Sequence, residues 1–138
     1  MRSDKARSYM NAPLDEAQHL YAAAQRDMTS LDILIASGRA PHETVGFLAQ
    51  QACEKLIKTL MVLHAIKIER THDLELLAHL AIAGGITLPM NAETLGQLNP
   101  YAVALRYEGT EVHWVAEQQA VAMVNQLNSF VEQSLQIQ

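Results

Sequence analysis

The stretch HETVGFLAQQACEKLIKTLMVLH, residues 42–64, decides the fold class. Its apolar residues recur at helical spacing in two adjacent stripes. The first stripe is Val45, Leu48, Ala52, Leu56, Leu60 and Leu63, and the second is Phe47, Cys53, Ile57 and Met61. A helix that is apolar over so wide an arc is predicted to be central, with neighbours on two sides. Its remaining face carries the polar side chains Gln51, Glu54, Lys55 and Lys58.

The segment before this helix predicts another long helix. Apolar residues recur there at spacings of three and four, namely Leu14, Ala17, Tyr21, Ala24, Met28, Leu31 and Ile35. Gly38 is expected to stop the helix, and Pro41 lies just beyond it. Helix-start rules place the N-cap near Pro13. We therefore expect residues 1–13 to form a flexible N-terminal arm and residues 14–138 to form a single helical domain.

Two short helices are predicted after residue 64. Thr71 or Asp73 can cap the first, and Gly84-Gly85 ends it. Its inward residues are Leu74, Leu77, Ala78 and Ala81. The second opens near Pro89 and Asn91, with Leu95 and Leu98 inward. Proline is costly inside a helix, so a break is expected at Asn99, with Asn99 as cap and Pro100 in the first turn of a helical continuation to Arg106.

The last predicted helix runs from about His113 to Leu135. Its core face is Ala120, Val124, Leu127, Val131 and Leu135. No window shows the alternation of apolar and polar residues that is typical of strands. The sequence therefore predicts an all-α fold, an up-down bundle of about five helices, three of them long and two short.

Length and composition exclude several classes of protein. A chain of 138 residues corresponds to one domain. The single cysteine, Cys53, excludes an intramolecular disulfide and is expected to be a buried free thiol. No apolar run is long enough to span a membrane, and the polar N-terminus does not resemble a signal peptide. We therefore expect a cytoplasmic protein without a membrane partner.

The charge distribution argues against non-specific binding to long nucleic acids. The net charge is −5, and it divides into +1 over residues 1–70 and −6 over residues 71–138. A protein that grips nucleic acid by bulk charge is expected to be basic. Contact with RNA would therefore have to come from a local patch or from a cleft between two copies. Arg106 is the only Lys or Arg after Arg70.

The segment RYEGTEVH, residues 106–113, holds the strongest candidates for catalysis. Arg106 is predicted to end one helix and His113 to begin the next, so the two can converge across a short turn. Arginine is a permanent cation with forked donors that suit a phosphate, and histidine can move a proton near neutral pH. Cleavage of RNA without a metal needs both: a base for the ribose 2′-hydroxyl and a cation for the charge that develops on the phosphate.

Two other groups of residues have both a functional and a structural interpretation. Lys55, Lys58, Lys67 and Arg70 can form a phosphate-binding patch, or can be solvated charges placed favourably at a helix C-terminus. His72, Glu75 and His79 can share one helical face and hold a metal, but exposed or hydrogen-bonded histidines are favoured. The sequence therefore predicts no metal and no other cofactor.

Three stretches together resemble the HEPN family of small helical domains. AQQACEKLIKTLMVLHAI, residues 49–66, resembles that family's second helix, with Glu54-Lys55 as its Glu-Lys pair. RTHDLELLAHL, residues 70–80, resembles its Thr-His-Asp-Leu segment. LNPYAVALRYEG, residues 98–109, resembles the stretch that ends in an Arg-Tyr pair, here Arg106-Tyr107. The resemblance covers roughly residues 15–135 and is to the Arg-Tyr branch, which is associated with nucleotidyltransferases.

The resemblance implies a five-helix bundle that forms a homodimer. It also implies a small nucleotidyltransferase partner, often in a toxin–antitoxin arrangement. Many members are metal-independent ribonucleases that use an Arg, four to six residues, and a His, which here would be Arg106 and His113. Lys55, Lys58, Arg106 and Tyr107 would bind the phosphate or nucleotide. The Arg-Tyr branch also has members that bind nucleotides without cleaving RNA, so a non-catalytic adaptor subunit is the alternative, and a purely structural dimer is a third.

Overall fold

The computed structural model describes residues 4–106 and 114–137, with side chains placed for 12–103 and 114–136. Within these ranges the chain forms five α-helices and one 3-10 helix, and no residue lies in a strand. The elements are α1 (Asp4–Ser37), α2 (His42–Leu63), α3 (Leu74–Ala83), α4 (Ala92–Gly96), η1 (Asn99–Arg106) and α5 (Glu117–Ile137). The prediction of an all-α bundle with three long helices is confirmed.

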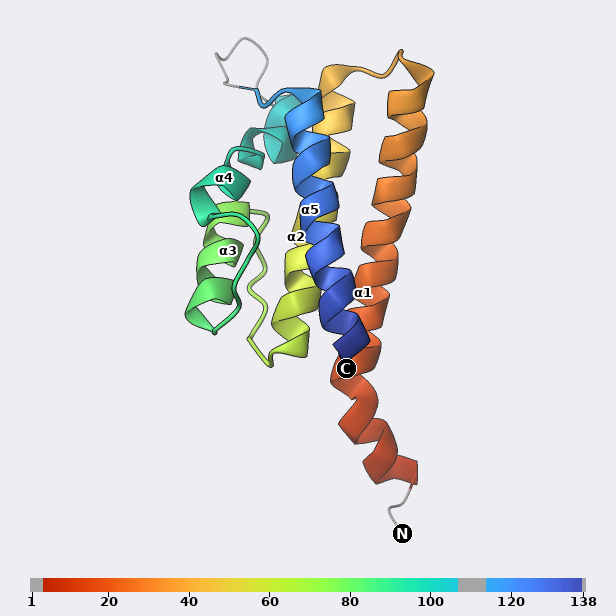
Figure 1. Ribbon diagram of the computed structural model, residues 1–138, viewed down its shortest axis with the longest axis vertical. Helices are drawn as coiled ribbons and strands as arrows, with labels where there is room; N and C mark the ends of the chain where they lie inside the picture. Colours follow the sequence, from red (N-terminus) through yellow and green to blue (C-terminus); the bar gives the residue numbers. More distant parts are fainter. Residues whose placement is uncertain (1–3, 107–113, 138) are drawn as a thin grey trace.

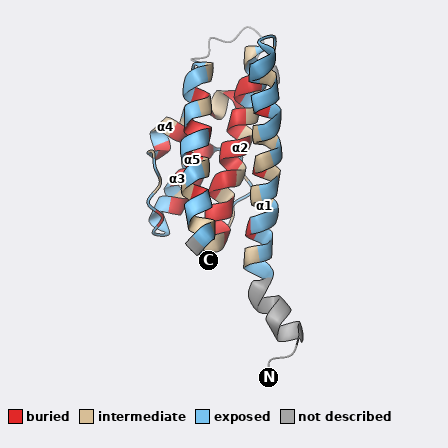
Figure 2. Ribbon diagram, turned by 45° about the vertical axis from the view of Figure 1, so that its right-hand side comes forward, coloured by how far each residue is buried: buried red, intermediate tan, exposed pale blue. Residues whose placement is uncertain are grey.

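The helix α2 lies at the centre of the bundle (Figure 2) and packs against α1, α3, η1 and α5. Both of its predicted stripes contribute fully buried side chains, among them Leu56, Ile57, Leu60 and Met61. The prediction for Phe47 is wrong, because its side chain is 41% exposed. Glu54, expected on the polar face, is instead only 5% exposed.

The path of the chain brings three distant segments together at one end of the bundle. α1 and α2 form an antiparallel pair, and the segment from α3 to η1 returns to the end at which α2 begins (Figure 1). α5 then runs beside α2 in the same direction, and the two helices are in contact. The starts of α2 and α5 and the helix η1 therefore meet.

Two helix starts differ from the sequence pattern. α1 begins at Asp4 and contains Pro13, so the predicted start near Pro13 is wrong. Proline removes one backbone donor, and the neighbouring Lys5, Ala6, Arg7 and Met10 are good helix formers. α5 begins at Glu117 and not near His113: residues 114–116 are non-helical, and Trp114 and Val115 contact Tyr101 of η1.

Candidate functional site

A tyrosine anchors the end of the bundle where α2, η1 and α5 meet. Tyr101 of η1 is 2% exposed, and its ring lies directly on the backbone of Gly46 in α2. A Cβ atom added to Gly46 would lie only 2.1 Å from Cε1 of the ring. Glycine costs a helix about 1 kcal/mol relative to alanine, so its presence here has a packing reason. The missing side chain makes room for the ring.

The hydroxyl of Tyr101 joins α2 to the segment that precedes α5. It donates a hydrogen bond of 2.7 Å to the backbone carbonyl of Val115 and lies 2.5 Å from Nε2 of His42. Because the hydroxyl has one proton, the contact with His42 requires the imidazole to donate. Burial raises the pKa of Tyr101 to about 12, and the carboxylates of Glu117 and Glu43 add to this. The phenol therefore stays neutral at physiological pH.

Two further rings complete this anchor. The indole of Trp114 lies with its centroid 4.6 Å from that of Tyr101, tilted by 38°. His42 makes edge contacts with both rings, at 5.4 Å from Tyr101 and 6.3 Å from Trp114. Nδ1 of His42 lies 3.4 Å from the carboxylate of Glu117 at the start of α5. The aromatic anchor, which we define as His42, Tyr101 and Trp114, thus holds the starts of α2 and α5 against η1.

The predicted catalytic residues, Arg106 and His113, lie between Tyr101 and Trp114 in the sequence. Arg106 is the last residue of η1, and its side chain lies outside the described part of the chain. Tyr107 and His113 also lie outside the described residues. The helix η1 and the segment that precedes α5 both lie at the end of the bundle where α2 begins (Figure 1).

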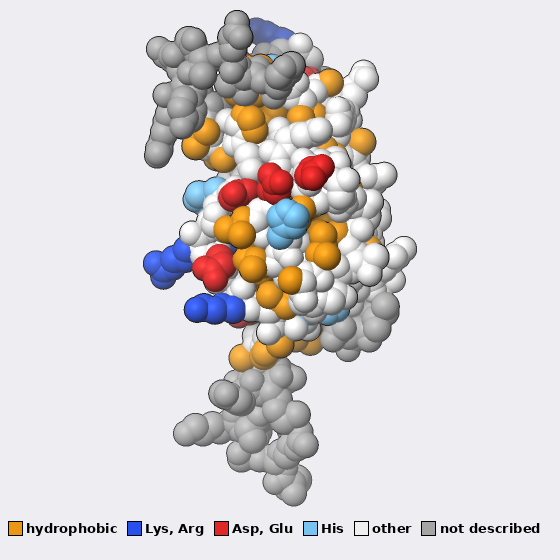
Figure 3. All heavy atoms as spheres, turned by 90° about the vertical axis from the view of Figure 1, so that its left-hand side faces the viewer, with side chains coloured by type: hydrophobic (Ala, Val, Ile, Leu, Met, Phe, Trp, Pro, Cys, Tyr) orange, Lys and Arg blue, Asp and Glu red, His pale blue; other side chains and the backbone are white. Residues whose placement is uncertain are grey.

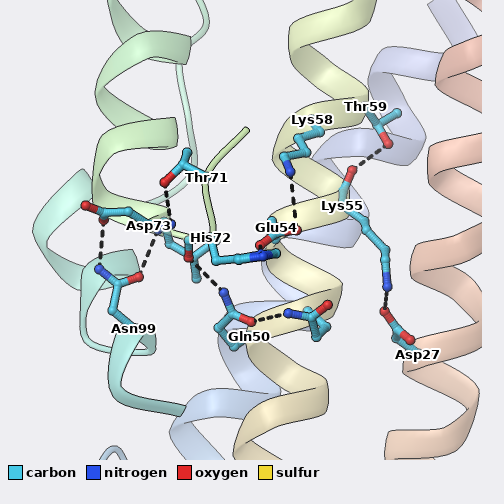
Figure 4. Close-up of polar contacts among 12 residues, drawn as sticks. Asp27, Gln50, Glu54, Lys55, Lys58, Thr59, Thr71, His72, Asp73 and Asn99 are labelled. Carbon is cyan, nitrogen blue, oxygen red and sulfur yellow. Dashed lines mark hydrogen bonds and ion pairs between the residues drawn. The ribbon is translucent and has the colours of Figure 1, made fainter. Parts of the chain in front are cut away.

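The polar face of α2 carries a second cluster, formed with the linker before α3 (Figure 4). The buried carboxylate of Glu54 lies 2.6 Å from Nδ1 of His72 and 3.3 Å from Nζ of Lys58. Gln50, which is fully buried, donates a 3.0 Å hydrogen bond to the backbone carbonyl of His72. A buried carboxylate is costly unless it is paired, so these contacts account for both the burial of Glu54 and the position of the linker.

The two lysines predicted to bind phosphate leave α2 in different directions (Figure 4). Lys55 forms an ion pair with Asp27 of α1, whereas Lys58 pairs with Glu54 one turn away on α2. Each ammonium group therefore has a carboxylate partner within the chain. The structure does not bring Lys55 and Lys58 together as one cationic patch.

The two histidines considered as metal ligands each contact a different carboxylate. His72 pairs with Glu54, and Nε2 of His79 lies 3.9 Å from the carboxylate of Glu75. In the described part of the chain, no three His, Cys, Asp or Glu side chains form a group that could hold a metal ion.

Comparison with known proteins identifies the family. The family model described as HEPN domain matches residues 17–137, which is most of the chain. The chain belongs to the HEPN domain family. No curated protein and no solved structure is similar enough to this chain to count as a match. Membership indicates a function related to nucleotides or RNA in general, and HEPN domains commonly dimerise.

A pocket of about 520 Å³ opens beside the aromatic anchor of this HEPN domain. Its described lining includes Trp114, Pro100 and the amide side chains of Gln97 and Gln119. Nε2 of Gln119 donates a weak 3.4 Å hydrogen bond to Oε1 of Gln97. None of the described lining residues is charged. Trp114, the first described residue after the segment 107–113, is one of its lining residues.

Among the described residues, the face over α3 and α4 carries no broad group of Lys and Arg side chains (Figure 3). On this side apolar and acidic side chains are interspersed, and the visible Lys and Arg lie mainly along one edge (Figure 3). Among the described residues, no helix is long and apolar enough to cross a membrane.

Sequence reasoning missed the aromatic anchor. The sequence pattern assigned no role to His42 or Trp114, and it predicted only that Tyr101 continues a helix. The available signal was Gly46, because a glycine inside an otherwise apolar helix often marks a close approach. The partner of that glycine is not given by any spacing along the chain.

Proposed function

We propose that this HEPN domain is a metal-independent RNA endonuclease that works as a homodimer. Arg106 would bind the scissile phosphate, His113 would act as acid and base, and Tyr107 would add a contact to the nucleotide. A small nucleotidyltransferase would hold the nuclease in check in the cytoplasm, in a toxin–antitoxin arrangement. The proposal rests on the family, on the order of these residues, and on the way the anchor closes their segment.

The observation that carries the proposal is the hydrogen bond from Tyr101 to Val115. Arg106 follows Tyr101 by five residues, and His113 precedes Val115 by two. The bond therefore fixes the described flanks of the Arg106–His113 segment at one point. Catalysis by a pair of side chains needs their anchoring elements to be held rigidly, and the contact of the buried Tyr101 with Val115 supports the proposal in this respect.

The proposed step needs no metal, because a histidine can carry the proton and an arginine can stabilise the developing charge. His113 would take the proton of the ribose 2′-hydroxyl, and the 2′-oxygen would then attack the adjacent phosphorus. The bond to the 5′-oxygen breaks, and the protonated histidine returns its proton to that leaving group. The products are a 2′,3′-cyclic phosphate and a 5′-hydroxyl. Arg106 would stabilise the negative charge that develops on the phosphate oxygens.

Lys55 and Lys58 would take a secondary part. Each is paired with a carboxylate, so binding of a phosphate there would have to replace Asp27 or Glu54. We therefore assign the primary phosphate contact to Arg106 and not to α2.

A non-catalytic adaptor that binds a nucleotide beside the nucleotidyltransferase is the second candidate function. Glu108 and Glu111 lie between Arg106 and His113 in the sequence. Either carboxylate could pair with Arg106 and withdraw it from the scissile phosphate, and such an ion pair would favour the adaptor.

The deciding experiment is incubation of the purified protein with an unstructured RNA in the presence of a chelator. Arg106→Ala and His113→Ala would be compared with Arg26→Ala, an exposed arginine on α1. We expect cyclic-phosphate ends from the wild type and from Arg26→Ala, and none from the two site variants, which should unfold at nearly the wild-type urea concentration. Absence of cleavage by a folded wild-type dimer would instead favour the adaptor.

A further inference from the structure

The pocket beside the aromatic anchor has the chemistry of a base-binding site. It joins an aromatic ring, a proline ring and two amides, and its volume of about 520 Å³ lies within the roughly 300–1,000 Å³ typical of ligand pockets. Phosphate-binding sites are cationic, but none of the described lining residues carries a charge. The described lining therefore suits a flat ring that can form hydrogen bonds at its edge.

Trp114 is prepared to stack on such a ligand. Its indole is 37% exposed although it packs against Tyr101 and touches His42. The ring is thus supported from within the anchor while part of its surface stays open to the pocket. Exposure of a large aromatic side chain costs free energy, and single-stranded RNA is commonly held by bases that stack on aromatic rings.

The two glutamines supply the polar part of the pocket. Their mutual hydrogen bond joins one amide nitrogen and one carbonyl oxygen, namely Nε2 of Gln119 and Oε1 of Gln97. The pair still presents a second carbonyl oxygen and a second amide nitrogen. One acceptor beside one donor is the pattern with which amide side chains read the edge of a base.

We propose that this pocket binds one unpaired nucleobase of a single-stranded RNA. The inference rests on the proposed function, because it takes RNA as the ligand of this end of the molecule. It assigns Trp114 to stacking and Gln97 and Gln119 to recognition of the base edge. The pocket would set the position of the strand, while Arg106 and His113 act on its phosphate.

The test uses the fluorescence of Trp114, which is the only tryptophan in the chain. The full protein would be titrated with a short unstructured RNA whose 2′-hydroxyls are methylated, so that it cannot be cleaved by 2′-oxygen attack. We expect saturable quenching of the indole. A dye-labelled copy of the same RNA, followed by anisotropy, should bind about fivefold or more weakly to Trp114→Leu, since stacking of one base contributes about 1–3 kcal/mol.

Matched variants separate the pocket from general surface effects. Phe47→Leu removes another exposed aromatic ring, and Gln118→Leu removes an exposed amide beside Gln119 that does not line the pocket. Both should bind the RNA as the wild type does, whereas Gln97→Leu should weaken binding. Equal affinity of Trp114→Leu and Phe47→Leu would overturn the proposal. So would indole fluorescence that changes with protein concentration but not with RNA, because a second copy of the chain would then occupy the pocket.

The outcome can be told apart from that of the nuclease test. Quenching of Trp114 with no cleavage of unmodified RNA would leave the base pocket standing and reject catalysis. Cleavage without quenching, and without an effect of Trp114→Leu on affinity, would reject the pocket and leave the nuclease standing.

Discussion

Gly46 is the residue whose role is least visible from its chemical nature. Alanine at this position would favour the helix by about 1 kcal/mol if the space were open. Its Cβ would instead meet the ring of Tyr101 at 2.1 Å. We expect Gly46→Ala to lower the free energy of unfolding by about 1–3 kcal/mol, as overpacking does in other cores. Urea unfolding followed by circular dichroism measures this.

A second substitution tests the cause of that loss. In a Tyr101→Leu background the aromatic ring is absent, so Gly46→Ala should become neutral or stabilising relative to that background. If the alanine costs the same free energy in both backgrounds, the contact between Gly46 and Tyr101 is not the reason for the glycine.

Tyr101 should also make stability depend on alkaline pH. In the unfolded chain a tyrosine loses its proton near pH 10, whereas burial raises the pKa of folded Tyr101 to about 12. A raised folded pKa means that this contribution is complete below pH 10 and is lost as the pH rises toward 12. The loss is at most about 3 kcal/mol over that window. Urea unfolding at a series of pH values measures it.

Tyr101→Phe isolates this contribution from other titrations. Below pH 10 the variant should be less stable than the wild type by about 1–3 kcal/mol, because the carbonyl of Val115 loses its donor. Between pH 10 and 12 that difference should shrink. Tyr21, whose pKa is also raised to about 12 by burial and by Glu132, titrates in both proteins and cancels. A difference that stays constant up to pH 12 would contradict the assignment to Tyr101.

Among the elements, α3 depends on a residue that lies far from it in the sequence. Asp73, one of the two caps that the sequence allowed, is its N-cap and accepts from the backbone of Glu75 and Leu76. Asn99 was expected to cap its own helix, but its Oδ1 accepts from the backbone of Leu74 at 2.8 Å and its Nδ2 donates to Asp73. The start of η1 therefore completes the cap of α3 (Figure 4).

This shared cap predicts non-additive substitutions. Asp73→Ala and Asn99→Ala should each cost about 0.5–2 kcal/mol in the free energy of unfolding. The double variant should lose less than the sum, by about 0.5 kcal/mol or more, because the bond between the two side chains is counted in both single variants. Denaturant unfolding of the four proteins gives the coupling.

Asn91→Ala is the control for that cycle. Asn91 caps α4 through a single local hydrogen bond to Thr94 and has no described contact with Asp73. Its effect should add to that of Asp73→Ala. Equal coupling in both cycles would mean that α3 and η1 are not linked through Asn99.

The limits of sequence reasoning follow from the distance over which each interaction acts. Ala17, Ala24 and Leu31 repeat within one helix, and their burial was predicted correctly from spacing alone. The sequence placed Trp114 to Ala116 in the last helix, but α5 begins only at Glu117, and the carbonyl of Val115 accepts a hydrogen bond from Tyr101 instead. His42 and Tyr101 are 59 positions apart, and no local pattern connects them.

At the scale of the whole molecule, polar residues of α2 hold the bundle together. The Glu-Lys pair that indicated the family, Glu54-Lys55, joins α2 to the linker before α3 and to Asp27 of α1. A family motif can therefore reflect the assembly of the bundle. The sequence places the candidate site in the segment after η1, which stays a prediction, whereas the aromatic anchor beside it could be found only from the fold.

Cys53 offers a measurement of how the whole bundle opens. Its side chain is fully buried in α2, and burial raises the pKa of the thiol to about 12. Disulfide reagents attack the thiolate, so the folded protein lacks both access and the reactive form. We expect Ellman's reagent to label Cys53 only through global unfolding. The free energy obtained from labelling rates should then match that from urea unfolding. Residue 129 is exposed on α5, so Ser129→Cys in a Cys53→Ala background should react at once. Labelling of Cys53 at a rate independent of urea would show instead that α2 is reached by a local opening, and the central helix would not belong to the same cooperative unit as the rest of the bundle.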